Sequence, residues 1–328
     1  MHLGADIGGT KTNLALVEAH APQELVFEDH VSSRAFPDLV TMVRAFLNMS
    51  GLTARTACLA VPGPVFRGRA ELTNLNWICV EKEIAQALGL QSVRLINDLV
   101  ATALGIDLLP VSDVVTLHAG KTVNEPELGQ VRAVIAPGTG LGEAFCVHNG
   151  DSWLVRPGEG GHAAWAPRNL DDADLWNFLF ERDGYVDVES VCSGTGVYNL
   201  WQWLSARQRG DEDPSLSEAI RAAADPTRVI MDAVDTSERC RLAVLAVVDH
   251  LANEACDVAV RLLPTGGIYL AGGLPPRLLP FLRSERFERR YLGHPTLGHV
   301  HHSVPVRVVI NPKAALLGTV ANVPRAGL

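Results

Sequence analysis

Apolar residues recur along the chain in two patterns, short runs rich in β-branched side chains and longer segments with helical spacing. The short runs predict strands at residues 57–61, 92–96, 131–136, 144–147, 267–271 and 306–310. The longer segments predict helices at residues 39–47, 81–88, 99–104, 240–263 and 313–321. This alternation of strands and helices predicts an α/β fold built in layers.

Glycine turns follow three of the predicted strands. Residues 2–5 and 13–18 flank the sequence GGTKT and predict a β-hairpin, and the other turns are GTGLG at 138–142 and Gly272-Gly273. Glycine lets backbone N–H groups approach a phosphate closely, but tight β-turns use the same residue. The turns therefore indicate either phosphate loops or ordinary turns, and none has the spacing of a dinucleotide-binding or P-loop motif.

Size, charge and cysteine content narrow the class of protein. A length of 328 residues predicts about two domains and a cleft between them. The net charge of −9 argues against a nucleic-acid partner, which requires a cationic surface. No apolar run is long enough to span a membrane, and the first residues lack a signal-peptide pattern. The six cysteines are scattered along the chain, which predicts reduced thiols. We expect a cytoplasmic protein.

A carboxylate lies at or just after the end of two predicted strands, Asp6 after residues 2–5 and Asp98 after residues 92–96. Asp6 precedes the first glycine turn, where a carboxylate beside phosphates requires a cation, and this placement predicts Mg²⁺ held largely through water. Thr10 adds a hydroxyl, and Lys11 is either a phosphate contact or a solvated lysine. Asn97-Asp98 opens a predicted helix, so Asp98 is either a general base or part of a helix cap.

Polar segments later in the chain give further expectations. In PGEGGH (157–162) the glycines allow Glu159 and His162 to face one ligand. Residues 207–217 predict a polar loop. His299 and His301 are spaced as in a strand, and we expect them in a solvated loop.

Several motifs occur together and in a fixed order. They are GADIGGTKTNLAL (4–16), LTNLNW (72–77), INDLVATALGI (96–106), PGTGLG (137–142), PGEGGH (157–162), the stretch 189–196 and GGIYLAGG (266–273). With these motifs the chain resembles the proteobacterial-type glucokinases, within the hexokinase, actin and Hsp70 ATPase superfamily. The resemblance extends over essentially the whole chain.

The resemblance implies a two-lobed actin-like ATPase (ribonuclease H-like) α/β fold with an interlobe cleft. The small domain would comprise residues 1–110 plus 310–328, and the large domain residues 111–309. The implied reaction transfers the γ-phosphate of ATP, with Mg²⁺, to the 6-hydroxyl of glucose. A homodimer is also implied.

The resemblance assigns roles to individual positions. Asp98 matches the catalytic aspartate and general base. The implied sugar-binding residues are Asn74, Asn97, Asp98, Glu159, His162 and Glu189. The implied phosphate loops are Asp6, Gly8, Gly9 and Thr10, with Asp6 meeting Mg²⁺ through water, and Gly138, Thr139 and Gly140, while Gly272 and Gly273 match the adenosine pocket.

Two alternatives stay open at this stage. GGTKT also resembles the ROK sugar kinases, which would make the chain a kinase for fructose, mannose or an N-acetylhexosamine. ROK members carry a cysteine-rich zinc motif near the sugar histidine, and none follows His162. A non-catalytic sugar sensor is the second alternative, but such regulators carry an N-terminal helix-turn-helix, for which the hairpin leaves no room.

Overall fold

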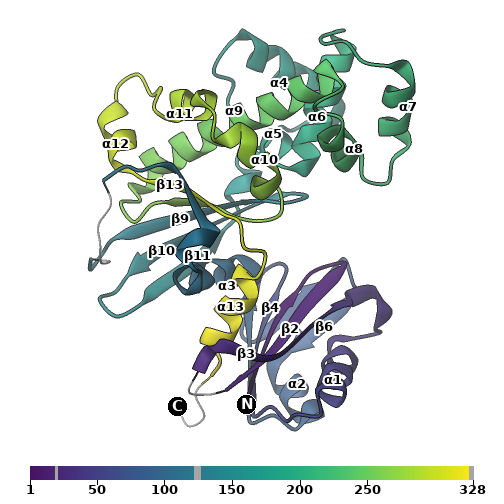
Figure 1. Ribbon diagram of the computed structural model, residues 1–328, viewed down its shortest axis with the longest axis vertical. Helices are drawn as coiled ribbons and strands as arrows, with labels where there is room; N and C mark the ends of the chain where they lie inside the picture. Colours follow the sequence, from purple (N-terminus) through teal and green to yellow (C-terminus); the bar gives the residue numbers. More distant parts are fainter. Residues whose placement is uncertain (19–20, 122–126, 325–328) are drawn as a thin grey trace. The chain divides into compact units, whose positions relative to one another are not determined.

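The computed structural model describes residues 1–18, 21–121 and 127–324. The chain forms two compact units, each with its own sheet (Figure 1). Unit 1 comprises Met1–Asp113, Val155–Pro157 and Asn311–Leu328, and unit 2 comprises Val114–Leu154 and Gly158–Ile310. Residues 325–328 of the predicted C-terminal segment lie outside the described residues.

Unit 1 is built on a five-stranded sheet with the order β3-β2-β1-β4-β7. Strands β1, β4 and β7 are parallel, and β2 is antiparallel to both β1 and β3. The elements of this unit are β1 (His2–Ile7), β2 (Lys11–Glu18), β3 (Ala21–Ser32), α1 (Leu39–Ser50), β4 (Thr56–Val61), β5 (Arg69–Leu72), β6 (Trp77–Val80), α2 (Glu81–Leu88), β7 (Ser92–Asn97), α3 (Asp98–Gly105) and α13 (Ala314–Ala321), with 3₁₀ turns at Ser33–Ala35, Ile106–Leu108 and Val111–Asp113.

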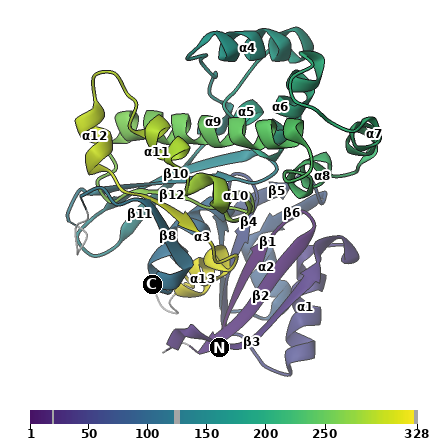
Figure 2. The same ribbon diagram turned by 45° about the horizontal axis from the view of Figure 1, so that its top comes forward.

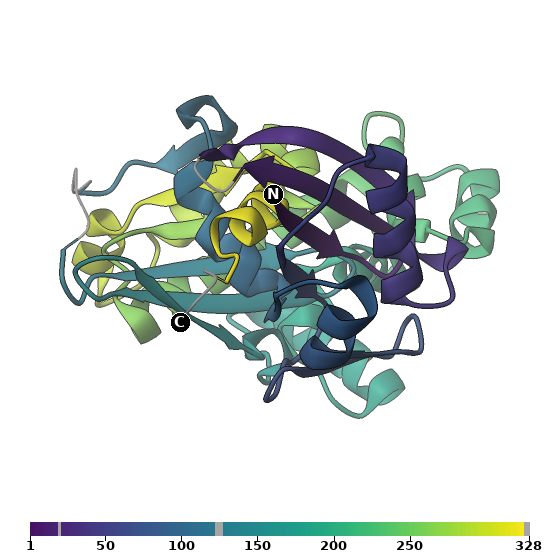
Figure 3. The same cartoon turned by 90° about the horizontal axis from the view of Figure 1, so that it is seen from below.

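Alternating side chains of the unit 1 strands lie on opposite faces of the sheet, and both faces are buried. Leu3 and Leu59 pack with α1 and α2 on one face, whereas Cys58 packs with α3 and Ala15 with α13 on the other. The C-terminal helix α13, yellow in Figures 1 and 3, therefore completes a layer of the first unit. Helices cover both faces, as an α/β fold requires.

Two glycines allow α3 and α13 to approach closely. A Cβ on Gly318 would lie 1.8 Å from the carbonyl oxygen of Ala101, and one on Gly105 would lie 1.9 Å from that of Ala314. No side chain fits at either position. These contacts fix the helix that begins at Asp98 against the C-terminal helix of the same unit.

Unit 2 is built on a six-stranded mixed sheet with the order β11-β10-β9-β12-β13-β8. Its strands are β8 (Val114–His118), β9 (Val131–Pro137), β10 (Leu141–His148), β11 (Trp153–Gly158), β12 (Ile268–Leu270) and β13 (Val306–Val309). Its helices are η4 (Gly160–His162), α4 (Leu170–Asp183), α5 (Glu189–Cys192), α6 (Gly194–Ala206), α7 (Pro214–Ala222), α8 (Pro226–Asp232), α9 (Glu238–Leu262), α10 (Pro275–Leu282), α11 (Glu285–Tyr291) and α12 (Gly298–Ser303).

The long helix α9 is the centre of the unit 2 core. It contacts α5, α6, α8, α10, α11 and α12 and packs on β9 (Figure 2). Its apolar residues join those of the sheet in one buried cluster, which includes Trp201 and Trp203. Despite its length, α9 is not a membrane span: among the described helices none is both long and apolar enough to cross a bilayer.

The predicted strands and helices are confirmed to within a few residues, but two expected loops are wrong. Within residues 207–217, helix α7 begins at Pro214. Asp213 accepts a hydrogen bond from the N–H of Ser215 as the N-cap, and proline suits the first helical turn because it lacks an N–H to satisfy. Buried Ile220 anchors the helix, so the Asp-Pro start signal outweighed the polar composition.

The histidine-rich segment is also a helix, α12, instead of a strand or a solvated loop. His301 is completely buried, and its Nε2 lies 3.0 Å from the carbonyl oxygen of Cys256. The ring also stacks on His294 and packs edge-on against Tyr291. His301 is therefore a core residue, and among the described residues no cluster of three or more ligating side chains exists.

Candidate active site

The predicted site residues fall into two sets, one in each unit. Set one comprises Asp6, Gly8, Gly9, Thr10, Asn74, Asn97 and Asp98 in unit 1. Set two comprises Gly138, Thr139, Gly140, Glu159, His162, Glu189, Gly272 and Gly273 in unit 2.

The parallel strands of unit 1 bring the ends of β1 and β7 to one side of the sheet. The glycine turn follows β1, and Asp98 follows β7 with β4 between these strands. Ligands of α/β folds bind at the carboxyl ends of such strands. Burial raises the pKa of Asp6 to about 6, and the negative charge of Asp98 adds to this effect. The two carboxylates are therefore electrostatic neighbours.

The first glycine turn is fixed by hydrogen bonds. Gly8 N–H donates to the carbonyl oxygen of Lys11 at 3.0 Å, and a Cβ on Gly8 would lie 2.6 Å from that oxygen. Ser33 Oγ donates to the carbonyl oxygen of Gly8 at 2.7 Å. Asn74 lies beside the turn, since a Cβ on Gly9 would be 3.5 Å from its Cβ. The structure thus brings Asn74 to the predicted phosphate loop, and Thr10 is exposed there.

Asn97 is the N-cap of α3. Its Oδ1 accepts from the N–H groups of Leu99 and Val100, and its Nδ2 donates to the carbonyl oxygen of Gly63 at 3.1 Å. The capping interpretation therefore holds for Asn97. Asp98 occupies the first position of the helix, and its Oδ1 accepts from Leu99 N–H at 2.9 Å.

The second glycine turn, Gly138–Gly140, joins β9 to β10 and meets the start of α6. Gly194 N–H donates to the carbonyl oxygen of Gly138 at 2.8 Å. Thr195 donates both its N–H and its hydroxyl to the carbonyl oxygen of Thr139, at 3.1 and 3.0 Å. These contacts place the turn at the N-terminus of a 13-residue helix, where backbone N–H groups favour an anion.

A cavity of about 600 Å³ opens at this turn. It is lined by Gly138, Thr139, Gly194, Thr195, Tyr198, Ala224, Asp225, Pro226, Thr227, Gly273, Leu274 and Arg277. The cavity thus joins predicted glycines of two different turns to residues that sequence reasoning missed, among them Tyr198 and Arg277. The sequence does indicate the part of the lining formed by Gly194 and Thr195, because Ser193 is a typical N-cap residue and α6 begins directly after it.

The glycines of PGEGGH let the loop lie against β10. A Cβ on Gly160 would lie 1.8 Å from Glu143 Oε2, and one on Gly161 would lie 2.1 Å from the carbonyl oxygen of Leu141. The close atom at Gly161 belongs to the backbone, so only glycine permits the approach there. The 3₁₀ turn Gly160–His162 follows directly after Glu159, so both predicted sugar ligands are carried by one short turn.

Glu189 is held close to the second glycine turn. Its Oε2 accepts from Leu141 N–H at 2.6 Å, and a Cβ on Gly140 would lie 2.3 Å from the same oxygen. The pKa of His162 is raised chiefly by its hydrogen bond with Asp187, and the charges of Glu189 and Glu159 add to this effect. In unit 2 the charges of Glu159 and Glu189 therefore act on His162.

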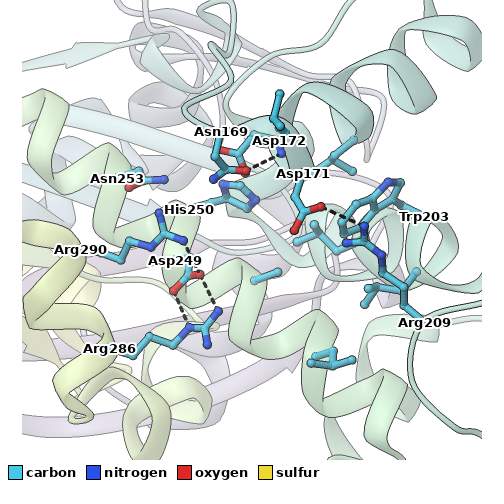
Figure 4. A pocket seen from close by; sticks show the side chains of 16 residues that line it. Asn169, Asp171, Asp172, Trp203, Arg209, Asp249, His250, Asn253, Arg286 and Arg290 are labelled. Carbon is cyan, nitrogen blue, oxygen red and sulfur yellow. Dashed lines mark hydrogen bonds and ion pairs between the residues drawn. The ribbon is translucent and has the colours of Figure 1, made fainter. Parts of the chain in front are cut away.

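A larger cavity of unit 2, about 730 Å³, lies among α4, α6, α9 and α11 and contains none of the predicted residues (Figure 4). The arginines that line it pair with Asp171 and Asp249. Arg286 binds Asp249 through two 2.6 Å hydrogen bonds, and Arg209 binds Asp171 at 2.9 Å. The candidate site is therefore assigned to the glycine turns and not to this cavity.

Comparisons with known proteins identify the family of the chain. The sequence profile of the family described as Glucokinase matches residues 3–325. A glucokinase of Trichormus variabilis is 36% identical over 334 residues, covering 96% of both chains. The crystal structure of a glucokinase from an Antarctic psychrotroph has a TM-score of 0.81 and 29% identity, covering 98% of this chain and 97% of the other.

A more distant structure shows the fold alone. It is the ROK family glucokinase from Streptomyces griseus in complex with glucose and AMPPNP, with a TM-score of 0.64 and 18% identity, covering 97% of each chain. These matches confirm the predicted family and the α/β fold class. The chain belongs to the glucokinase family, and its reaction is the phosphorylation of glucose.

Proposed function

We propose that ATP is the phosphoryl donor and that Asp98 is the general base for the 6-hydroxyl of glucose. The observation that carries this proposal is the position of Asp98 at the carboxyl end of β7, beside Asp6 and on the same side of the sheet as the Gly8–Thr10 turn. Glucose and an ATP analogue occupy the Streptomyces griseus protein, which shares the fold.

In the proposed reaction, the 6-oxygen of glucose forms a bond to the γ-phosphorus of ATP as the bond to the ADP oxygen breaks. The hydroxyl proton passes to the carboxylate of Asp98, and the products are glucose 6-phosphate and ADP. The transition state of phosphoryl transfer is loose, so the protein contributes mainly by positioning and electrostatics. General-base assistance typically contributes about 10²–10⁴-fold to the rate.

We propose that Glu159, His162 and Glu189 bind the hydroxyls of the hexose, with Asn74 and Asn97. Carboxylates accept from hydroxyl groups, whereas the imidazole and amide groups both donate and accept. A pocket that pairs each hydroxyl discriminates strongly against a sugar that lacks one, because its polar groups are then left unpaired. The fixed positions of Glu189 on Leu141 and of His162 on Asp187 support this role.

The nucleotide is proposed to occupy the 600 Å³ cavity, with its phosphates at Gly138–Gly140 and Gly8–Thr10 and its adenosine near Gly272 and Gly273. Gly272 has a φ of 84°, and a Cβ there would lie 2.9 Å from the carbonyl oxygen of Pro137. Glycine is therefore required for the backbone to turn at the cavity wall.

The residues present suit Mg²⁺ bound together with ATP. Asp6 offers a carboxylate whose hydrogen bond from Asn13 is long, at 3.4 Å, and hard oxygen donors are the ligands that Mg²⁺ prefers. Among the described residues no three ligating side chains converge, so the metal would arrive with the nucleotide. When bound, Mg²⁺ neutralises negative charge on the transferred phosphate.

The test crosses a panel of hexoses with ATP, ADP and polyphosphate, each with and without Mg²⁺, in a coupled assay. Glucose with MgATP should give the highest kcat/KM. Asp98→Asn should lower kcat by about 10²–10⁴-fold and leave the KM for glucose within about twofold. Asp107→Asn, in the 3₁₀ turn after α3, is the matched control. A normal kcat for Asp98→Asn would remove Asp98 from the mechanism.

We also propose the homodimer that the family resemblance implies, and the cytoplasmic location expected from the absence of a signal-peptide pattern and of a membrane-spanning apolar run. Sedimentation velocity on the full chain should give a species of twice the monomer mass. A single monomeric species at the concentration of the activity assay would contradict the dimer.

A further inference from the structure

The loop PGEGGH (157–162) is called the sugar loop below. The segment that follows it, residues 163–165, pairs with residues 186–188, directly before Glu189. Trp165 N–H donates to the carbonyl oxygen of Val186, and Val188 N–H donates to that of Ala163, each at 3.0 Å. Val186 and Val188 are both buried in the core of unit 2. Because side chains alternate along an extended segment, the intervening Asp187 faces away from that core. The pairing thus brings Asp187 beside the loop that ends at His162.

Asp187 contacts His162 with one carboxylate oxygen and helix α5 with the other. Its Oδ2 lies 3.0 Å from Nδ1 of His162. Its Oδ1 accepts from the N–H of Ser190 at 2.9 Å and from the hydroxyl of Ser190 at 2.5 Å. The carboxylate is therefore fixed before a ligand arrives, whereas the imidazole is 59% exposed and available to a substrate.

We propose that Asp187 is a positioning residue for the hexose: its carboxylate accepts the Nδ1–H of His162 and directs Nε2 of the ring to a sugar hydroxyl. This inference rests on the proposed role of His162 as a hexose ligand. A neutral imidazole carries one N–H, so a proton fixed on Nδ1 leaves Nε2 as a hydrogen-bond acceptor. Without the carboxylate, both the tautomer and the orientation of the ring are free to change.

The same carboxylate links two proposed hexose ligands. Asp187 binds Ser190 at the start of α5, and that helix begins with Glu189, whose own carboxylate is held by Leu141. Tyr185 adds a further constraint, because its hydroxyl donates to the carbonyl oxygen of His162 at 3.0 Å. His162 and Glu189 are thus held at a fixed separation by Asp187.

The charged groups around His162 all act in one direction. The hydrogen bond with Asp187 is the largest cause of the raised pKa of His162, and the charges of Glu189, Asp187 and Glu159 also raise it, whereas burial lowers it. Hydrogen bonds from Ser190 and His162 lower the pKa of Asp187, although burial alone would raise it. Asp187 consequently stays ionised while His162 titrates.

The decisive variant is Asp187→Asn. An asparagine Oδ1 can still accept from Ser190 and cap α5, but its amide N–H₂ then faces Nδ1 of His162. Nδ1 must become the acceptor, so the imidazole proton moves to Nε2. We expect ¹⁵N NMR of the ligand-free protein at high pH to show an Nδ1-protonated ring in the unaltered chain and an Nε2-protonated ring in Asp187→Asn.

Kinetics measure the consequence for the sugar. Asp187→Asn should raise the KM for glucose by about 10–100-fold, the loss expected for one hydrogen bond to a charged group, with the KM for ATP within about twofold. The pH at which His162 titrates should also fall. Asp183→Asn, at the end of α4 where Asp183 pairs with Arg182, should change neither the tautomer nor either KM.

An unchanged ¹⁵N pattern overturns the proposal, and so does a changed tautomer with an unchanged KM for glucose. If Asp187→Asn does not fold, Asp187→Ser retains a capping oxygen and removes the charge, with the same expected fall in the titration point and rise in KM. The NMR measurement needs no turnover. If the proposed Asp98 mechanism fails, the failure appears in the chain with Asp187 unaltered. It can therefore be distinguished from a failure of the role proposed for Asp187.

Discussion

The side chains of Asp6 and Asp98 lie near enough at the carboxyl end of the unit 1 strands for the charge of Asp98 to raise the pKa of Asp6. Burial is the larger cause, and the hydrogen bond from Asn13 opposes it. A pair of carboxylates beside a glycine turn is costly unless a cation joins them. In the proposed function, Mg²⁺ bound with the phosphates of ATP would supply that cation.

Asp6 should titrate near pH 6 in the ligand-free protein. The folded pKa lies above the unfolded value of 3.8, so its contribution to stability is present at low pH and is lost as pH rises from about 4 to about 6. Asp98→Asn should move the titration downward but not to 3.8, because burial remains. Carboxyl ¹³C NMR measures this directly, with Asp29→Asn on β3 as a control that leaves Asp6 unchanged.

Gly161→Ala should displace the sugar loop. The added Cβ would lie 2.1 Å from the carbonyl oxygen of Leu141, a backbone atom of β10, so the loop must move away from that strand. We expect the KM for glucose to rise at least tenfold and the KM for ATP to change little. Gly158→Ala is the matched control, since its Cβ meets only an ordinary 3.8 Å contact. Equal effects of the two substitutions would contradict the role assigned to this close approach.

Glu143 and Glu254 form a buried carboxyl pair under the same loop. Burial raises the pKa of Glu254 to about 8, and the charge of Glu143 adds to this effect. The ion pair of Glu254 with Arg261, at 3.0 Å, lowers the pKa but does not offset the rise. Because the folded pKa exceeds the unfolded one, the free energy of unfolding should fall as pH rises from about 4.5 to about 8.

Glu254→Gln should remove most of this pH dependence and increase stability at pH 8 by a few kcal/mol, as an order of magnitude. Chemical denaturation at a series of pH values measures it. Glu218→Gln, an exposed carboxylate on α7, should leave the profile unaltered. A flat profile in the unaltered chain would show that Glu254 is ionised in the native state.

Most of the fold could be predicted from local patterns. The helix predicted at 81–88 has those limits in the structure, because Gly89 adopts φ 68° where other residues are strained. The helix start at Pro214 and the helix of His301 were missed, since burial of Ile220 and His301 depends on distant parts of unit 2.

The sequence by itself determined the elements, the glycine turns and the residue types of a sugar kinase, because periodicity, turn chemistry and motif order are local properties. Only the tertiary structure decided which residues meet. Asp187, Tyr198 and Arg277 belong to no local motif, and their neighbours His162 and Gly138 lie 25 or more positions away in the chain. Strand pairing and helix packing bring such residues together, and these depend on burial summed over a whole unit.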